Sequence, residues 1–456
     1  MKFFLLKMYL SGIKNIEKEI EINFYNSTLK RSFDASNSHV KAIYGSNGAG
    51  KTGIMYAVDI YKNLVLDPKY LTVCNANGSL NFLVNQNTQE FKIKMIYLCV
   101  IKNGTNKVFS HTIKIKKVNN EFKIIEENLS ELSGLNLNNA EKYSTIFKSI
   151  DGKLVELHKK CKYINELEKN TMNLLSSQSF VCAAVRPQFS NTNIENIKNI
   201  KFDGTLLAAS LLLVGFVASI TVVLQGSDRF FDYSDAFEQL YKVINQHMPN
   251  KNDEIPLDTF SNIKLSYLDT QRVLKSKFEE HQKYIHNLSV FIKVFNNDLE
   301  DIEIKKDENG DYYECENVMV YKNKRISEKY ESTGIKKLIN LYSALCDLDR
   351  GRIVFIDEFD ANLHDVLLEK LVQFIMQYSK GQFVFTTHNL GPMDVLQTAK
   401  NSIDFLSSDS RIVSWTKNGN YTAASQYKKG LIKYSPFNIE PFSFLGVFGD
   451  EQKWNF

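Results

Sequence analysis

The chain has 456 residues, which is enough for two or three compact lobes built around a sizeable core. Its formal net charge of +4 is small and neither demands nor excludes nucleic-acid binding, because such binding depends on basic residues clustered on one face. Six cysteines are scattered with no C-x-x-C pair, which argues against a disulfide framework or a zinc site and favours a reducing, cytoplasmic location.

Alternating apolar residues at Ile20, Ile22 and Phe24 predict antiparallel strands at the start of the chain. A phosphate-binding motif follows, since Gly45-Ser46-Asn47-Gly48-Ala49-Gly50-Lys51-Thr52 fits G-x-x-x-x-G-K-[ST]. Residues 40–44 read as a buried strand that enters this loop, and residues 51–66 read as the helix that leaves it.

Each part of this motif has a chemical reason. Glycines let several backbone N–H groups point at one phosphate, and the helix N-terminus adds partial positive charge. Lys51 neutralises the outer phosphates, and Thr52 offers its hydroxyl to Mg²⁺. The motif therefore predicts a nucleoside triphosphate site with Mg²⁺, and the alternative is a glycine-rich turn with a solvated lysine.

A second strand-rich patch follows the predicted helix. Alternating apolar residues over 91–99, a turn at Asn103-Gly104 and a return over 108–116 predict a hairpin beside the nucleotide core. We take residues 1–127 as the N-terminal half of the core.

Residues 128–300 read as an inserted helical arm, in which Asp235 and Glu238 form a capping box. Within it, the segment 206–224 carries no charge over a length that could span a membrane. A single crossing would separate the two halves of the nucleotide site, so we expect a buried or oligomer-facing helix. A re-entrant hairpin broken near Gly215 stays open as the membrane alternative.

Two further strands end in polar residues. Residues 352–356 read as a buried strand that leads into Asp357 and Glu358, and residues 382–386 read as another that leads to His388. In a P-loop fold the first acid lies beside the metal, so Asp357 is expected to hold Mg²⁺ with Thr52. Glu358 can orient or deprotonate the attacking water, and a neutral His388 can contact the γ-phosphate. The alternatives are solvated turn acids and a structural histidine.

The stretch 331–338 carries Ser332 and Gly334 in the pattern E-S-x-G-x-K-K-L. It precedes I-D-E-x-D-A-x-L-H, which contains Asp360, and then F-T-T-H. This order resembles the ABC-type ATPases of the SMC, RecF and OLD group. Within that group it is most similar to the compact AAA-15-type branch found in bacterial anti-phage defence systems. The resemblance covers residues 1–66 and 331–395 well, and the arm by position alone.

The resemblance implies an α/β P-loop fold of the ABC-ATPase type, with an antiparallel β subdomain and an inserted helical arm. It implies ATP and Mg²⁺ as cofactors, and a head-to-tail homodimer or higher oligomer. In that dimer Ser332 and Gly334 of one subunit cap the γ-phosphate bound by another, and Asp360 lies at the seam. The family's glutamine loop has two candidates, Gln86 and Gln89.

Residues 301–456 are the expected C-terminal half of the core. A closing hairpin is predicted from residues 411–416, a turn at Asn418-Gly419 and a strand from Tyr421 onward. The basic, aromatic stretch 428–449 reads as an ordered strap or a docking surface. About seventy residues follow His388 without a Glu and Asp-x-Asp cluster, so we expect no fused Toprim domain.

Three functions fit this sequence. The first is an ATPase that assembles with ATP and controls a separate effector, a nuclease or toxin, in defence against phage. The second is a DNA-repair ATPase that clamps duplex DNA, so nucleic acid stays open as a partner. The third is a slowly hydrolysing, nucleotide-gated scaffold.

Overall fold

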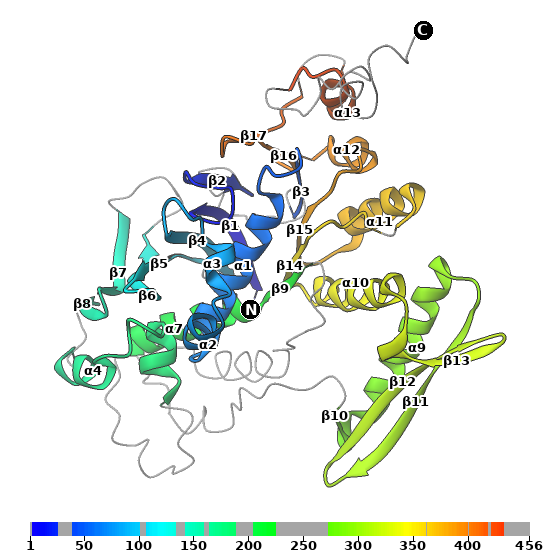
Figure 1. The fold of residues 1–456 in the computed structure, drawn as a ribbon, viewed down its shortest axis with the longest axis horizontal. Helices are drawn as coiled ribbons and strands as arrows, with labels where there is room; N and C mark the ends of the chain where they lie inside the picture. The colour runs from blue at the N-terminus through cyan, green and yellow to red at the C-terminus, as the bar shows by residue number, and fades with distance from the viewer. Residues whose placement is uncertain are drawn as a thin grey trace, which may run out of the picture.

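A computed structural model describes ten stretches of the chain: residues 2–25, 39–100, 106–133, 142–158, 164–187, 204–224, 272–361, 363–399, 401–417 and 421–432. They form three sheets and a set of helices (Figure 1). The predicted α/β fold is confirmed, with a parallel sheet that carries the P-loop and an antiparallel sheet beside it.

The central sheet has six strands, five of them parallel. In spatial order they are β17 (Ile412–Ser414), β16 (Ile403–Leu406), β3 (Val40–Gly45), β15 (Gln382–Thr386), β14 (Ile353–Ile356) and β9 (Ile220–Val223). Only β17 runs antiparallel to its neighbour. The strands β3, β14, β15 and β16 are buried along their whole length, because they are nearly continuous apolar runs that suit a sheet covered on both faces.

The second sheet is antiparallel and has seven strands. In spatial order they are β2 (Ile20–Asn23), β1 (Lys2–Ser11), β4 (Glu90–Val100), β5 (Asn106–Val118), β6 (Glu121–Leu132), β7 (Tyr143–Ile150) and β8 (Lys153–Leu157). The predicted hairpin is therefore confirmed as β4 and β5. Its Asn103-Gly104 turn lies outside the described residues.

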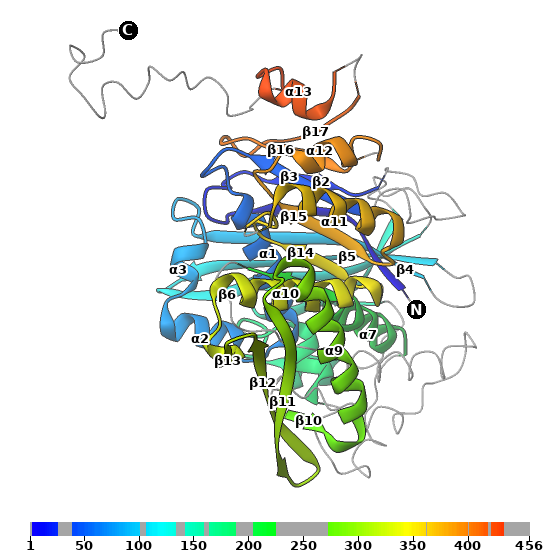
Figure 2. The ribbon, with the colours of Figure 1, turned by 90° about the vertical axis from the view of Figure 1, so that its right-hand side faces the viewer.

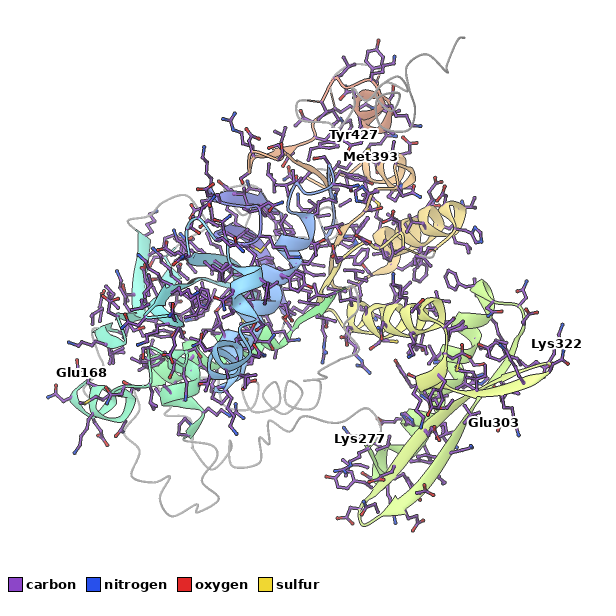
Figure 3. All side chains as sticks on the ribbon, in the orientation of Figure 1. Glu168, Lys277, Glu303, Lys322, Met393 and Tyr427 are labelled. Atoms are coloured by element: carbon purple, nitrogen blue, oxygen red, sulfur yellow. The ribbon has the colours of Figure 1, made fainter. Side chains whose placement is uncertain are left out.

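One core joins these two sheets, and it includes side chains of two helices, α1 (Lys51–Leu66) and α7 (Gly204–Ala218). The opposite face of the parallel sheet packs on α10 (Thr333–Asp349), α11 (Asp365–Tyr378), α12 (Gly391–Leu396) and α13 (Ala423–Lys428). Figure 2 shows α10 and α11 in front of the parallel sheet and the antiparallel strands behind it. Met393 and Tyr427, which Figure 3 labels, belong to this second core. The parallel sheet is thus the middle layer.

A smaller unit projects from the C-terminal half. It consists of β10 (Arg272–Leu274), α9 (Phe278–Phe295), β11 (Leu299–Asn309), β12 (Tyr312–Tyr321) and β13 (Lys324–Ser327). Lys277, Glu303 and Lys322 lie on it (Figure 3). Its own apolar core includes Ile335 and Leu338 of α10, so α10 ties the projecting unit to the central sheet.

The remaining regular elements of the N-terminal half are α2 (Tyr70–Asn77), α3 (Leu80–Leu83), α4 (Ile164–Thr171) and a π-helical turn (Val181–Val185). Two 3₁₀ turns, Lys275–Lys277 and Glu328–Tyr330, contact α9 and β12 of the projecting unit. The π-helical turn contributes to the core shared by the two large sheets.

The apolar segment 206–224 differs from the expectation of one helix in an arm. It forms α7 up to Ala218, and then β9, which pairs in parallel with β14. Ser219 lies between the two elements, and its hydroxyl donates to the Phe216 carbonyl in the last turn of α7 at 2.6 Å. The apolar character is explained by burial in the core that joins the two large sheets. Within the described residues no helix is long and apolar enough to cross a membrane.

Other parts of the predicted arm also differ. The range 128–300 holds β7 and β8, which extend the antiparallel sheet, as well as helices α4, α7 and α9. The capping box at Asp235 and Glu238 lies outside the described residues.

The predicted closing hairpin is wrong in its partners. Strand β17 pairs with β16, and the residues after Tyr421 form α13, whose N-cap is Thr422. The turn at 418–420 and the tail from 433 onward lie outside the described residues.

Candidate functional site

The P-loop connects β3 to α1 as predicted. Gly50, the N-cap of α1, has φ +108°, and a Cβ there would lie 2.6 Å from Ile16 Cγ1. A Cβ on Gly45 would lie 2.5 Å from the Leu406 carbonyl oxygen of the neighbouring strand. Both positions therefore require glycine. The loop is braced from outside, because Asn15 Nδ2 donates to the Gly48 carbonyl at 2.7 Å.

Lys51 folds back over the loop that precedes it. Its Nζ donates to the carbonyl oxygens of Gly45 at 2.8 Å and Ser46 at 3.1 Å. Burial lowers the pKa of Lys51, and the nearby charges of Asp357, Glu358 and Asp360 act in the opposite direction. The lysine is therefore a cation held within electrostatic reach of three carboxylates.

Asp357 lies at the carboxyl end of β14, where its backbone N–H donates to the Val223 carbonyl of β9 at 2.9 Å. Its side chain is buried, and its Oδ1 accepts a hydrogen bond of 2.6 Å from the Thr386 hydroxyl. Its Oδ2 has no hydrogen-bond partner among the described residues. A buried carboxylate oxygen without a partner is costly, so it suggests that a cation belongs there.

Glu358 and Asp360 occupy the turn that follows. Glu358 has φ +47°, a left-handed conformation that is uncommon outside glycine and is concentrated at functional sites. The backbone N–H of His388 donates to Asp360 Oδ2 at 3.3 Å, while Asp360 Oδ1 is buried and lacks a partner in the described chain. The ends of β14 and β15 are thus joined side by side.

The imidazole of His388 lies near charges of both signs. Burial and the positive charge of Lys51 lower its pKa below the ordinary value of 6.5, while Asp360, Glu358 and Asp357 counteract this shift. The lowered pKa favours the neutral ring at pH 7, in which one nitrogen can donate and the other accept a hydrogen bond.

Lys51, Glu358 and His388 line one cavity of about 610 Å³. Its lining comes from the P-loop and the start of α1 (Asn47, Gly48, Gly50, Lys51, Thr52, Gly53), from Lys14 and Asn15, from α3 (Phe82), from the segment between α3 and β4 (Val84, Asn85, Gln86, Asn87), and from Glu358 and His388. Ala49 is buried in the loop, where its N–H donates to the Ser46 carbonyl. The structure therefore brings P-loop residues, Glu358 and His388 to one cavity, while Asp357 and Asp360 are absent from its described lining but act on the charge of Lys51.

The donor set fits Mg²⁺. Thr52 offers a hydroxyl at the cavity wall, and Asp357 offers a buried carboxylate oxygen that no described group satisfies. Hard oxygen ligands supplemented by phosphate oxygens and water are the environment that Mg²⁺ prefers.

The two signature residues, Ser332 and Gly334, also lie apart from this cavity. Ser332 is the N-cap of α10, where its Oγ accepts the Ile335 N–H at 3.3 Å, and Gly334 is in the first turn. The preceding Glu331 is fixed by the hydroxyl of Tyr321 at 2.7 Å. Neither Ser332 nor Gly334 lines the cavity within the described chain. Of the two glutamine candidates, Gln86 lines the cavity and Gln89 does not appear in its wall.

Sequence reasoning missed Lys14 and Thr386. Lys14 has φ +45°, its ammonium lies 4.1 Å from the ring centroid of Tyr56, and it reaches the cavity because strand β1 ends beside the P-loop. Thr386 could have been noticed as a polar residue at the tip of an apolar strand next to the acid strand.

Part of the chain matches a known protein family. Residues 256–394, which include Ser332, Asp357, Glu358 and His388, match the family described as "AAA domain, putative AbiEii toxin, Type IV TA system". Among curated proteins no sequence matches the chain. Among solved structures, the chain is similar to the recombination mediator protein RecF with ATP from the RecFOR pathway. The identity is 12% and the TM-score is 0.36, over 91% of this chain and 99% of RecF.

Proposed function

We propose that the chain binds and hydrolyses ATP at the cavity described above. One observation carries this proposal: three strand ends bring Lys51, the acids Asp357 and Glu358, and His388 to a single site. Such a convergence at the carboxyl edge of a parallel sheet is the usual position for a ligand in an open α/β fold.

Each residue has a role in this proposal. The P-loop N–H groups and Lys51 bind the phosphates, Thr52 and Asp357 hold Mg²⁺, Glu358 orients or deprotonates the attacking water, and a neutral His388 contacts the γ-phosphate. When bound, Mg²⁺ neutralises charge that develops on the phosphate oxygens.

We further propose that ATP drives assembly of a dimer or higher oligomer. Ser332 caps a helix of 17 residues and lies outside its own chain's cavity, so it is free to serve a second subunit. A helix N-terminus with a serine hydroxyl suits a phosphate, and Asp360 would then lie at the seam between subunits. Only the triphosphate would bridge both chains, so ATP would stabilise the assembly.

For the biological role we propose control of a separate nuclease or toxin in anti-phage defence, in the cytoplasm. The motif resemblance supports this role, and the matched family description refers to a toxin–antitoxin system. The DNA-clamp alternative predicts duplex binding that weakens steeply with salt, and the scaffold alternative predicts tight assembly with very slow turnover.

The test is the solution mass of Glu358→Gln, measured by light scattering after size exclusion with and without Mg²⁺ and ATP. This variant should bind ATP without hydrolysing it, and its mass should at least double with ATP. The double variant Lys51→Met, Glu358→Gln is the control and should not respond. A large mass that ignores ATP would contradict ATP-driven assembly. Normal hydrolysis by Glu358→Gln would contradict the role of Glu358.

A further inference from the structure

A single buried hydroxyl contacts both residues of the acid pair. Thr386 ends β15 and is fully buried. Its Oγ1 donates to Asp357 Oδ1 at 2.6 Å and accepts the backbone N–H of Glu358 at 2.8 Å. A hydroxyl has one proton to donate and lone pairs to accept, so both hydrogen bonds can form together.

The first of these hydrogen bonds fixes the orientation of the Asp357 carboxylate. Because Thr386 occupies Oδ1, the oxygen that lacks a partner among the described residues is Oδ2. The carboxylate is therefore held in one orientation, with Oδ2 left for a cation. Partners of this kind, which fix a metal ligand without touching the metal, strongly affect metal affinity.

The second bond holds the backbone of Glu358. This residue adopts φ +47°, which a non-glycine residue maintains only where its surroundings fix it. The N–H of Glu358 donates to Thr386 Oγ1, and the N–H of Phe359 donates to the Thr386 carbonyl at 3.0 Å. The same threonine thus anchors two successive amides of the turn that places Glu358 at the cavity wall.

We propose that Thr386 is a positioning residue for ATP hydrolysis, one that orients Asp357 toward the metal and Glu358 toward the attacking water. This inference rests on the proposed ATPase function. Thr386 acts through its two neighbours and does not itself line the cavity.

The adjacent residue, Thr387, provides a matched control. Thr387 is equally buried, but its hydroxyl oxygen accepts the backbone N–H of Asn389 at 3.0 Å. A valine at either position has nearly the shape of threonine without the hydroxyl. If packing alone mattered, Thr386→Val and Thr387→Val would behave alike.

The experiment compares wild type with Thr386→Val, Thr386→Ser and Thr387→Val. Three quantities are measured: affinity for a non-hydrolysable ATP analogue without divalent metal, affinity of that complex for Mn²⁺ by electron paramagnetic resonance, and kcat with Mg²⁺. For Thr386→Val we expect unchanged metal-free nucleotide affinity, with Mn²⁺ affinity and kcat each about 10- to 100-fold lower. Thr386→Ser keeps the hydroxyl, so it should stay close to wild type, as should Thr387→Val.

Wild-type Mn²⁺ affinity and kcat in Thr386→Val would overturn the proposal, as would an equal loss in Thr387→Val. If Thr386→Val does not fold, Thr386→Ala removes the same hydroxyl and is compared with Thr387→Ala under the same criteria. Failure of wild type to bind the ATP analogue at all would instead refute the proposed function.

Discussion

The ammonium of Lys51 lies 2.8 Å from the carbonyl oxygen of Gly45, so the lysine is bound to its own loop. It makes a second hydrogen bond to the Ser46 carbonyl at 3.1 Å. A triphosphate would draw Lys51 away from these neutral acceptors, because a negatively charged phosphate oxygen adds the attraction of opposite charges to the hydrogen bond.

The first prediction follows from this arrangement. Lys51→Met should weaken ATP binding about 10- to 100-fold, because a charged hydrogen bond contributes about 1.5–3 kcal/mol. Fluorescence titration with a labelled ATP analogue measures the affinity. The control is Lys69→Met, which removes an exposed lysine outside the cavity lining and should leave affinity unchanged. Equal binding by Lys51→Met and wild type would remove the lysine from the phosphate site.

The second prediction concerns action between subunits. Ser332→Asp keeps a good N-cap for α10, and it places a negative charge where the γ-phosphate is expected. The variant should bind ATP as a monomer but lose both ATP-driven assembly and hydrolysis. Lys51→Met alone should also lose hydrolysis.

Mixing these two inactive variants should restore hydrolysis. Each mixed dimer contains one site with an intact P-loop and an intact signature, so up to about a quarter of wild-type activity should return. The double variant Lys51→Met, Ser332→Asp mixed with Lys51→Met leaves no P-loop intact and is the control. A mixture that stays inactive would contradict a signature shared between subunits.

The P-loop unit could be predicted from the sequence because its signals are local. The strand, the glycines and the helix adjoin along the chain, and α1 begins at Lys51 and ends at Leu66 as expected. Strands β14 and β15 could be found for the same reason, since each is a short apolar run with a polar end.

Strand β9 was hidden because its partner is far away in sequence. Ile220 pairs with Ile353, and nothing within the apolar segment indicates that contact. A helix and a strand joined without a charge between them resemble one long helix. The β-branched run Ile-Thr-Val-Val was the available signal for a strand.

The hairpin of β7 and β8 had a clearer local signal. Asp151 and Gly152 form its turn with φ +47° and +74°, the conformation that Asp-Gly favours between antiparallel strands. The contacts of Thr386 could not be foreseen in the same way. They join two strand ends 28 and 29 residues apart, and only the sheet order makes those strands neighbours.

The third prediction is a pH dependence. Since burial and Lys51 lower the pKa of His388 below 6.5, the ring should be neutral at pH 7 and become protonated only at more acidic pH. If the neutral ring is required, kcat/KM should fall as the pH is lowered, with the midpoint of the fall below pH 6.5. In His388→Gln the rate should drop about 100-fold or more, and the fall of kcat/KM at acidic pH that is caused by histidine protonation should disappear.

His364→Gln is the control for this profile, because His364 is the N-cap of α11 and is absent from the cavity lining. Its pH profile should match wild type. A histidine-dependent fall with its midpoint above pH 6.5, absent from His388→Gln, would contradict a lowered pKa of His388.

The last prediction tests whether the apolar segment belongs to the core. Phe216 of α7 is fully buried, and its ring stacks on Tyr97 of β4 with centroids 3.9 Å apart and an interplanar angle of 3°. Phe216→Ala should lower the free energy of unfolding by about 3–5 kcal/mol, because it removes a large side chain and leaves a cavity. Phe82→Ala is the matched control, since that ring is 81% exposed and its loss should change stability by about 0.5 kcal/mol or less. Urea denaturation of both variants without nucleotide gives the comparison. If the segment instead met lipid or another subunit, Phe216→Ala would be as stable as Phe82→Ala, and α7 would have to be removed from the core that joins the two sheets.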